Sequence, residues 1–368
     1  MGFGGQLVRL VERLPLSKDC TGREIHLLTL RADEPWHYAA GDWLLIPPCN
    51  PRGEVDQLLE LLGCTGEESV SQLSLREVLS CQRTITRVAP ALVEWLEQRD
   101  GTLGQGRKGP VSEKLALLSD GHGVASFLRS RATVPPTWQE LLPLLRPLAP
   151  RAYSIASGPT GGSCDLRLLV ATALYNGWDS GLRCGVCSTY LTRTLQVGDT
   201  LPCRVGTSRF HMPDDGQTDL ILVGPGVGLA PFLGFLEQRA WLQATGHTLG
   251  RCWLFFGARN RATDFIGEDI LRKHLESGIL TRLDTAFSRD QGSKIYVQDR
   301  IRENGAELGR WLDHGACLYV CGDARAMARD VEGALVELVA RHGELDGAAA
   351  RDHVLGLRAQ GRYRQDVY

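Results

Sequence analysis

The sequence lacks a long, uninterrupted hydrophobic run. Its longest uncharged stretch, LILVGPGVGLAPFLGFL from Leu220 to Leu236, is broken by glycine and proline. A transmembrane helix needs about 20 consecutive apolar residues, so this stretch predicts no membrane span. The first residues, MGFGGQLVRL, also lack the apolar core of a signal peptide. We therefore expect a cytoplasmic protein with no membrane span.

The sequence also lacks an excess of charge of either sign. It has 41 Lys and Arg against 43 Asp and Glu, which gives a net charge of −2. Nothing in this balance predicts a nucleic-acid or membrane partner. The 368 residues are 43% hydrophobic and 23% charged, which is ordinary for a globular protein. The chain is too long for one comfortable core, so we expect two or three domains.

The cysteines do not suggest a disulfide framework. There are 11 of them, an odd number, and they are scattered along the chain, as is typical of reduced intracellular thiols. One Cys-x-x-Cys pair is present, formed by Cys184 and Cys187, but a zinc site would need a second ligand pair. Thioredoxin-like chemistry would need a different fold around the pair. No metal site is predicted.

The hydrophobic pattern changes twice along the chain. Short strand-like segments extend from Gln6 to Pro48, separated by turn residues, as in a small antiparallel barrel. From Asp56, apolar residues spaced by three and four predict helices, and strand character returns at Arg151. From Asp219, strands alternate with helices, which implies a parallel sheet with crossover helices. No internal repeat or low-complexity tract is evident.

One predicted strand carries an unusual set of side chains. The stretch RAYSIASGP, residues 151–159, offers Arg151, Tyr153 and Ser154 within four positions. A core strand favours apolar residues on its buried face. A fixed cation, an aromatic ring and a hydroxyl could instead hold a flat, anionic ligand together.

A glycine-rich turn in LILVGPGVGLAPF lies between a predicted strand and a predicted helix. Gly224, Gly226 and Gly228 would let the backbone approach a pyrophosphate at the helix N-terminus. A tight turn that binds no ligand would have the same sequence.

A second candidate for a pyrophosphate is GVCSTYL, from Gly185 to Leu191, where backbone amides precede a helical turn. The alternative is an ordinary helix N-cap by Ser188 or Thr189.

The stretch FSRDQGSKIYVQ predicts a phosphate-monoester site. Ser288 and Arg289 follow a strand of the parallel sheet, and Lys294 and Tyr296 come shortly after. A guanidinium, an ammonium, a hydroxyl and a phenol suit the 2′-phosphate of NADPH. The alternative is a solvated, charged loop end.

Two further stretches are ambiguous by themselves. LYVCGD ends a predicted strand with Cys321, and a buried cysteine at a strand end is usually packing. The terminal RYRQDVY carries Asp366 and Tyr368, although chain ends are usually frayed.

Taken in order, seven motifs point to one family. They are RAYS, GVCSTYL, GPGVGLAPF, FFGARN, AFSRDQGSKIYVQ, YVCGDARAMARDV and RYRQDVY. The chain resembles, from about Val8 to Tyr368, the FAD/NADPH-binding half of the diflavin reductases, and most of all the flavoprotein subunits of NADPH-sulfite reductases. Each motif is weak alone, but seven in this order are highly specific.

The resemblance implies a ferredoxin reductase-like fold that combines a β-barrel with an α/β domain. The expected parts are an FAD-binding antiparallel barrel, a helical connecting insertion, the rest of the barrel, and an NADP-binding domain with a parallel sheet, at 1–52, 53–146, 147–216 and 217–368. The implied cofactors are FAD and NADPH. The implied activity is hydride transfer from NADPH to flavin N5, followed by delivery of single electrons to a flavodoxin-like or FMN-domain partner and its haem, iron–sulfur or other metal acceptor.

The resemblance also implies the residues that bind FAD. Arg151 matches a pyrophosphate contact, Tyr153 packs against the flavin or its ribityl chain, and Ser154 lies near flavin N5. The positions that match FAD contacts in this family are Thr86, Arg151, Ala152, Tyr153, Ser154, Leu169, Val170, Ala171, Tyr175, Gly185, Val186, Cys187 and Ser188.

On the NADPH side, Ser154, Cys321 and Asp366 match a catalytic polar trio beside the nicotinamide. Tyr368 matches a terminal aromatic ring that stacks on the flavin and must give way to the nicotinamide. The positions that match NADPH contacts are Gly226, Val227, Arg259, Ser288, Arg289, Lys294, Ile295, Tyr296, Val297, Gln298 and Asp330.

Two features depart from the family pattern. Val227 replaces a threonine of the family's GTG turn, which puts one hydrogen bond to NADPH in question. Members usually carry a flavodoxin-like FMN domain before this region, whereas this sequence starts almost at the barrel. We therefore expect the FMN domain on another polypeptide, removed from this chain, or not used.

Two other functions are compatible with parts of the sequence. A ferredoxin–NADP reductase shares the barrel, the nucleotide domain and a terminal tyrosine, but the helical insertion argues against it. A flavin-binding subunit that docks a partner without turnover of its own would not need Ser154, Cys321 and Asp366 intact.

Overall fold

The computed structural model describes residues 4–17, 24–100, 123–176 and 182–368. The chain divides into two compact units. The first unit consists of Met1–Gly5, Leu45–Arg151 and Thr172–Gln196, and the second of Gln6–Leu44, Ala152–Ala171 and Val197–Tyr368.

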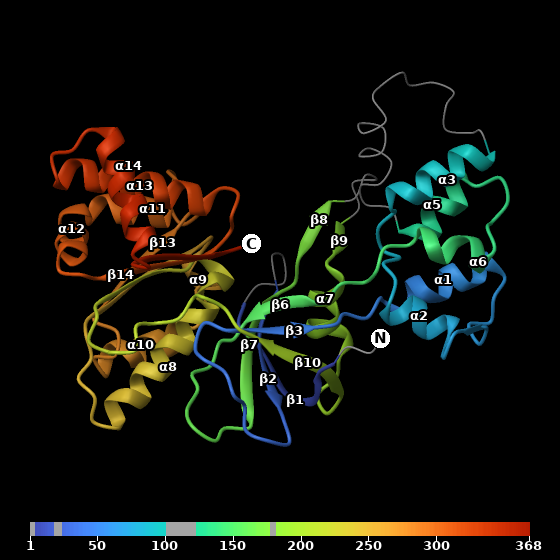
Figure 1. The fold of residues 1–368 in the computed structure, drawn as a ribbon, viewed down its shortest axis with the longest axis horizontal. Coiled ribbons are helices and arrows are strands. Elements are labelled where there is room, and N and C mark those ends of the chain that lie inside the picture. The colour runs from blue at the N-terminus through green and yellow to red at the C-terminus, as the bar shows by residue number, and fades with distance from the viewer. Residues whose placement is uncertain (1–3, 18–23, 101–122, 177–181) are drawn as a thin grey trace. The chain divides into compact units, whose positions relative to one another are not determined.

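A six-stranded sheet occupies the barrel-like region (Figure 1). Its strand order is β6-β3-β10-β1-β2-β7, and β1 pairs antiparallel with both β10 and β2. The boundary between the two units passes within β3 and β6. The bounds of the six strands are β1 Gln6–Pro15, β2 Ile25–Arg31, β3 Trp43–Ile46, β6 Arg151–Ser154, β7 Asp165–Ala171 and β10 Thr200–Gly206.

A five-stranded sheet, in which every neighbouring pair of strands is parallel, forms the C-terminal domain. Its strand order is β13-β12-β11-β14-β15. Parallel strands covered on both faces read as continuous apolar runs, and the central strand β11 is LILV, buried at all four positions. The bounds are β11 Leu220–Val223, β12 Cys252–Ala258, β13 Arg282–Phe287, β14 Cys317–Gly322 and β15 Tyr363–Val367.

Helices cover both faces of this parallel sheet (Figure 1). Alternate residues of β11 belong to two different cores: Leu220 and Leu222 to one, Ile221 and Val223 to the other. The first core includes α8 and α10, together with residues of the antiparallel sheet, and the second includes α11 to α14. The helices are η3 Gly226–Leu229, α8 Ala230–Ala244, α9 Arg261–Asp264, α10 Glu268–Glu276, α11 Val297–Glu303, α12 Gly305–Asp313, α13 Met327–His342 and α14 Gly347–Ala359.

The first unit is mostly helical and has a core of its own. Among its described residues, the helices are α1 Arg52–Leu62, α2 Leu75–Cys81, α3 Pro90–Asp100, α5 Val124–Arg131, α6 Trp138–Leu141, η1 Leu142–Leu144, α7 Val186–Thr189 and η2 Tyr190–Thr194. Two short hairpins accompany them, β4 Ser69–Val70 with β5 Leu73–Ser74, and β8 Leu174–Asn176 with β9 Leu182–Cys184.

The predicted fold class is confirmed, because an antiparallel barrel-like region precedes a parallel α/β domain. The four domain bounds stay a prediction. Five elements of the C-terminal domain were not predicted from the hydrophobic pattern: α9, α11, α12, α14 and β15.

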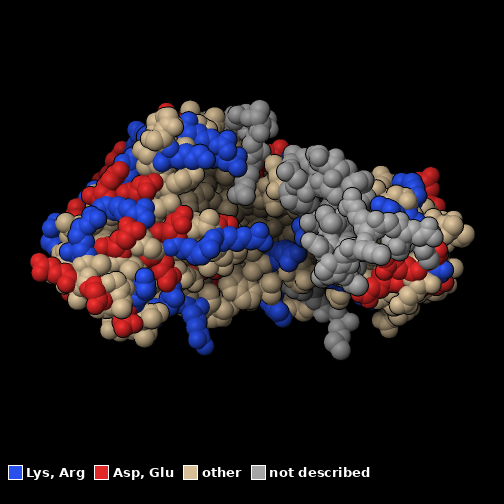
Figure 2. Space-filling model, turned by 90° about the horizontal axis from the view of Figure 1, so that it is seen from above, with Lys and Arg blue, Asp and Glu red and all other residues tan. Residues whose placement is uncertain are grey.

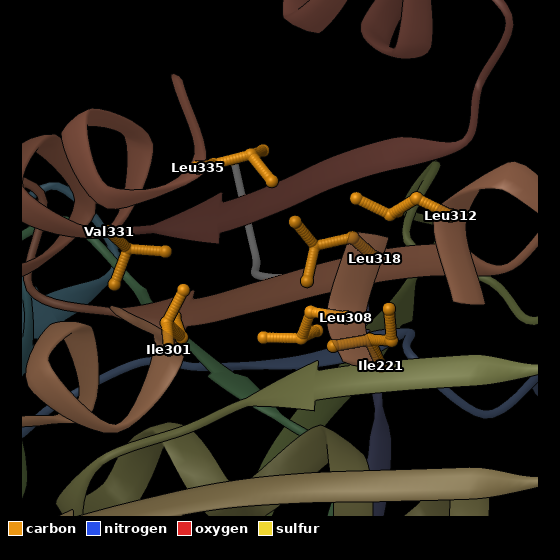
Figure 3. Close-up of a pocket in the computed structure, with 7 residues that line it drawn as sticks. All are labelled: Ile221, Ile301, Leu308, Leu312, Leu318, Val331 and Leu335. Atoms are coloured by element: carbon orange, nitrogen blue, oxygen red, sulfur yellow. The ribbon is translucent and has the colours of Figure 1, made fainter. Parts of the chain in front are cut away.

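A void in the second core does not qualify as a ligand site (Figure 3). Its lining consists of aliphatic side chains that all belong to this core: Ile221, Ile301, Leu308, Leu312, Leu318, Val331 and Leu335. Such a lining offers no side-chain hydrogen bond to a nucleotide, so the void is a packing feature between the sheet and its helices.

The lengths of the helices and the charges on the surface bear on the partners that the protein can have. Among the described residues, no helix combines the length and the apolar character that crossing a membrane requires. The face shown in Figure 2 carries both Lys and Arg and Asp and Glu side chains. This mixture is in keeping with the net charge of −2.

Candidate functional site

The structure brings the predicted polar trio together. Parallel pairing of β14 with β15 sets Cys321 opposite Asp366. Ser154, the last residue of β6, donates a hydrogen bond from Oγ to Asp366 Oδ2 at 3.0 Å. The Cys321 Sγ atom lies 4.0 Å from the same carboxylate oxygen. All three residues belong to the second unit, although 212 positions separate Ser154 from Asp366.

Burial controls the protonation of this trio. Burial raises the pKa of the Asp366 carboxyl, while the hydrogen bond from Ser154 partly opposes that effect. Burial also raises the pKa of the Cys321 thiol well above its ordinary value, and the charge of Asp366 adds to the rise. Cys321 therefore stays a thiol near neutral pH and can act as a weak donor, not as a nucleophile.

The strand that supplies Asp366 is ordered to the end of the chain. The Tyr368 amide donates to the carbonyl of Gly322 at 3.1 Å, and the Ala324 amide donates to the carbonyl of Tyr368 at 3.1 Å. Arg364, within β15, donates from Nη1 to the carbonyl of His211 at 2.6 Å. Tyr368 nevertheless remains 64% exposed. The terminal residues are thus fixed by their backbone and accessible through their last side chain.

The glycine-rich turn after β11 has the geometry of a tight backbone approach. Gly226 has φ +56° and open space where a Cβ atom would stand. A Cβ atom on Gly228 would clash with the carbonyl oxygen of Cys321, so this turn must pack directly against β14. Val227 is partly buried and packs on the first core, and its aliphatic side chain has no group that can form a hydrogen bond.

Ser288 and Arg289 of the predicted phosphate-binding group follow the carboxyl end of β13, and Arg259, a predicted NADPH contact, follows the end of the neighbouring strand β12. The Ser288 amide donates to the carbonyl of Ala258 at 3.0 Å, and the Arg289 amide donates to the carbonyl of Arg259 at 2.8 Å. These bonds set the backbones of Arg259 and Arg289 side by side. Arg259, Arg289 and Lys294 are all exposed. Ligands of open parallel sheets bind at this end of the strands.

Two further NADPH predictions are joined by a hydrogen bond. Gln298, at the start of α11, donates from Nε2 to Asp330 Oδ2 at 3.2 Å. Asp330 is in the first turn of α13. Ile295 and Tyr296 lead into α11, and Val297 is buried in the second core. Val297 is therefore a packing residue, which leaves only its backbone for a ligand.

The GVCSTYL stretch forms a compact turn in the first unit. Gly185 occupies the N-cap position of α7, and no side chain caps the helix by a hydrogen bond. Ser188 and Thr189 lie within the helix, so neither is its N-cap. Ser188 Oγ accepts from the Ala173 amide at 3.0 Å and donates to the Gly185 carbonyl at 3.1 Å. Thr189 Oγ1 is buried and has no hydrogen-bond partner among the described residues. Thr189 was not among the predicted ligand contacts. Its unsatisfied hydroxyl makes it a further candidate for a hydrogen bond to a ligand.

The other FAD predictions are divided between the two units. The first unit holds the half-buried Thr86, the exposed Arg151 and the stretch from Gly185 to Ser188. Tyr175 is in β8 of this unit, and its side chain lies outside the described part. The residues of the second unit are Ala152, Tyr153, Ser154, Leu169, Val170, Ala171 and Tyr368. Leu169 and Val170 are core residues, buried to 4% and 0% exposure. One FAD site formed by all these residues stays a prediction.

The cysteines form no metal centre in the described part of the chain. No group of three or more His, Cys, Asp or Glu side chains there has the arrangement to hold a metal ion. The ten cysteines within the described ranges are free thiols.

Comparison with known proteins gives the same picture. Residues 222–333 match the oxidoreductase NAD-binding domain. The flavoprotein alpha-component of NADPH-sulfite reductase from Pectobacterium atrosepticum is 37% identical over 95% of this chain and 57% of its own length. The corresponding proteins of Photorhabdus laumondii and Cronobacter sakazakii are each 37% identical, over 95% and 98% of this chain and 58% and 60% of theirs. The chain thus spans less than two thirds of these curated relatives.

These relatives bear out the resemblance that the sequence motifs predicted. The resemblance extends over nearly the whole chain, and the matched domain covers the strands and helices that carry the glycine turn, Arg259, Arg289 and Cys321. The predicted enzyme class and the two predicted cofactors agree with the flavoprotein and NADPH in the names of the relatives.

Proposed function

We propose that this chain, a homologue of the FAD/NADPH-binding module of the diflavin reductases, is an NADPH-dependent FAD reductase. The observation that carries the proposal is the trio of Ser154, Cys321 and Asp366, held together where β15 joins a sheet whose strands β12, β13 and β14 lie in the matched oxidoreductase NAD-binding domain. Bound NADPH would supply a hydride, and bound FAD would accept it at N5 and could then release electrons singly.

The residues present fit an NADP-type coenzyme. Gly226 leaves its turn open where a side chain would stand, and the helix that follows can offer backbone N–H groups to a pyrophosphate. Arg259, Arg289 and Lys294 would hold the 2′-phosphate through charge-assisted hydrogen bonds. Gln298 and Asp330 would orient the adenosine end.

The residues present also fit FAD. That all of them contact the same FAD molecule is part of the proposal. Arg151 would pair with the pyrophosphate, and the amides of the turn from Gly185 to Ser188 would hold it from a second side. The buried hydroxyl of Thr189 is available for a further hydrogen bond. Tyr153 and Tyr368 would pack on the ring system.

Within the trio, each side chain would have a separate task. Asp366 would stabilise the positive charge that develops on the nicotinamide as its hydride leaves. Ser154 orients that carboxylate through the 3.0 Å hydrogen bond. Cys321, kept protonated by burial, would fill the remaining space without adding a second negative charge.

The activity is tested by adding NADPH to the flavin-loaded protein without oxygen and following the flavin absorption band. Bleaching of the band with one equivalent of NADPH supports the proposal. An unchanged band in a protein that holds flavin would identify a docking subunit without turnover.

We also propose that a separate flavodoxin-like or FMN-containing protein or domain accepts the electrons and passes them to a haem, iron–sulfur or other metal centre. The relatives are sulfite reductase flavoproteins, and this chain covers only 57% and 60% of two of them. This difference in length supports the proposal that a further domain or a separate protein takes part in electron transfer. A cytoplasmic location belongs to the same proposal. Reduction of a purified flavodoxin by NADPH in the presence of the protein tests it, with ferricyanide as a control acceptor. Reduction of ferricyanide without reduction of the flavodoxin would contradict it.

FAD, and not FMN, should copurify at one flavin per chain. Two predicted anion-binding stretches, at Arg151 and Gly185, suit a dinucleotide better than a mononucleotide. Heat release followed by chromatography identifies the flavin, and absorbance against protein concentration gives the ratio. Reloading the flavin-free protein with excess FMN is the control. A second bound flavin, or FMN alone, would contradict the assignment.

Replacing the ring of Tyr368 should reduce the preference for NADPH over NADH. Aromatic stacking is worth about 0.5–1.5 kcal/mol beyond area burial, so Tyr368→Ser should speed flavin reduction by NADH by about 2- to 10-fold. The 2′-phosphate of NADPH helps displace the ring in the parent, so NADPH should gain less. Release of NADP⁺ should slow, because the nicotinamide can remain on the flavin.

The serine variant keeps the backbone hydrogen bonds of Tyr368 with Gly322 and Ala324, so it tests the ring and not the ordering of the chain end. Tyr368→Phe is the matched control and should behave as the parent. Stopped-flow reduction by both coenzymes measures the effect. An unchanged coenzyme ratio in Tyr368→Ser would mean that the ring makes no functional contact with the flavin.

A further inference from the structure

Two cysteine thiols outside the candidate site lie in direct contact. The Sγ atoms of Cys49 and Cys81 are 3.2 Å apart, although the residues are 32 positions apart in the chain. Cys49 follows β3, and Cys81 is the last residue of α2, both within the first unit (Figure 1). Neither residue has a task in the proposed hydride transfer.

The backbone around the two thiols is fixed by their neighbour Asn50. The Asn50 amide donates to the carbonyl of Ser80 at 2.7 Å. Its side-chain Nδ2 donates to the carbonyls of Leu79 and Arg83 at 2.7 and 2.6 Å. Asn50 is itself buried. The segment before α1 is therefore clamped to the end of α2, and the two thiols are held against each other.

The helix that carries Cys81 is equally well anchored. Ser74 and Glu77 form a reciprocal capping box at its start, and its residues Val78 and Leu79 are buried in the helical core. A disulfide has an S–S bond of about 2.05 Å, so the two sulfur atoms must approach each other by roughly 1 Å for the bond to form.

The two thiols differ in accessibility and in proton affinity. Cys81 is exposed, whereas Cys49 is half-buried. A hydrogen bond from Cys49 lowers the pKa of Cys81 to about 7, against the opposing effects of burial and of the Glu77 charge. The same contact, together with burial, raises the pKa of Cys49. The end of α2 carries the negative end of the helix dipole, so the Cys49 donor is what favours a thiolate there.

We propose that Cys81 and Cys49 form a reversible dithiol–disulfide site that reacts with hydroperoxides. The Cys81 thiolate attacks the peroxide oxygen, the O–O bond breaks, and a sulfenic acid forms as hydroxide leaves and takes up a proton. Cys49 then attacks the Cys81 sulfur and gives up its proton, the S–O bond breaks, and water leaves as the disulfide forms. In total, two thiols lose two electrons and two protons, and hydrogen peroxide becomes two waters. A dithiol reductant reverses the oxidation by exchange.

The site borders the stretch predicted to bind FAD, yet its chemistry does not depend on flavin. The charge of Cys187 and a hydrogen bond with Tyr190 both act on Cys49. Cys187 Sγ in turn lies 3.9 Å from the carbonyl of Ile46 at the end of β3. The proposal rests only on contacts within the first unit, so it can fail or succeed independently of the proposed reductase activity.

The test treats the flavin-loaded protein with one equivalent of hydrogen peroxide and then maps its peptides without reduction. We expect a cross-linked peptide pair that joins Cys49 to Cys81, the loss of two reactive thiols, and recovery of both with dithiothreitol. Cys81 oxidised to sulfinic acid without a cross-link, a cross-link to another cysteine, or two unmodified thiols would each overturn the proposal.

Variants assign the two roles. In Cys49→Ser, Cys81 should stop at the sulfenic acid and be labelled by dimedone, with no cross-link. In Cys81→Ser, no cross-link should form, and oxidation at this site by peroxide should slow by about 10-fold or more, because the accessible thiol of lowered pKa has been removed. Cys64→Ser, at a half-buried thiol after α1 whose pKa is raised by burial, is the matched control and should keep the cross-link. Equal dimedone labelling of Cys81 in the parent and in Cys49→Ser would overturn the resolving role of Cys49.

Discussion

Asp366→Asn should slow flavin reduction by NADPH about 100-fold while leaving the protein as stable as the parent or more so. The carboxylate would oppose the positive charge that forms on the nicotinamide, and removing one preorganised electrostatic group typically costs about 10²-fold in rate. The asparagine can still accept the hydrogen bond from Ser154, so the local geometry is retained.

The expected stability of Asp366→Asn follows from the raised pKa of the Asp366 carboxyl. Because the folded protein holds this proton to a higher pH than the unfolded chain, Asp366 lowers the free energy of unfolding as the pH rises through that interval. Below the ordinary carboxyl range, Asp366 is protonated in both states and the penalty vanishes. Asp366→Asn should therefore melt at the same temperature or higher at neutral pH, and the difference should shrink in acid.

The pH profile separates a functional carboxylate from a structural one. In the parent, the rate of flavin reduction should fall as the pH drops through the raised pKa of Asp366, and in Asp366→Asn that limb should be absent. Asp352→Asn, at an exposed position on α14, changes the net charge equally and is the control. Stopped-flow reduction across pH measures both. A normal rate in Asp366→Asn would remove Asp366 from the reaction.

The sequence predicted the fold where the hydrophobic pattern was strong. The runs LILV and CWLFF, buried on both faces, identified parallel strands, and the helix after the glycine turn was equally evident. The pattern also existed in α14, where Ala350, Val354 and Leu357 are buried at spacings of four and three. Small and charged residues between them hid it.

The last strand could not be predicted from hydrophobicity. β15 reads YRQDV, and only Tyr363 is buried. It lies at the edge of the sheet and pairs on one side only, with β14, so polar residues are tolerated there. Helix α11 has only seven residues, of which five are polar or charged, so its hydrophobic pattern is also too weak to predict it.

To predict the contacts within the polar trio, both the strand β15 and its register with β14 would have to be known. Only the pairing of Cys321 with Asp366 brings the two side chains together, and nothing in the local sequence specifies that pairing. Family resemblance supplied the residues, whereas their contacts came from the fold. Cys49 and Cys81 carried no sequence signal, because two single cysteines far apart in a chain have no spacing to interpret.

Arg289→Ala should weaken NADPH binding by about 10- to 100-fold and leave NADH almost unchanged. A hydrogen bond to a charged group contributes about 1.5–3 kcal/mol, and only NADPH carries the 2′-phosphate that would receive it. Arg351→Ala, at an exposed position on α14, removes the same charge from the protein and is the control. Anaerobic titration of the flavin band with each coenzyme gives the affinities. Equal weakening of NADPH and NADH would exclude a phosphate contact.

The neighbouring Arg259 makes the test sharper. The backbone hydrogen bond between Arg289 and Arg259 sets both residues at the ends of adjacent strands, so both guanidinium groups could reach one phosphate. If they share it, the loss in Arg259→Ala combined with Arg289→Ala should differ from the sum of the single losses by at least about 0.5 kcal/mol of coupling. Higher ionic strength should reduce the affinity of the parent for NADPH more than that of the double variant, because screening weakens only interactions that exist. If the losses of NADPH affinity in the two single variants add up to the loss in the double variant, and the affinities of the parent and the double variant depend equally on salt, Arg289 binds the phosphate without Arg259.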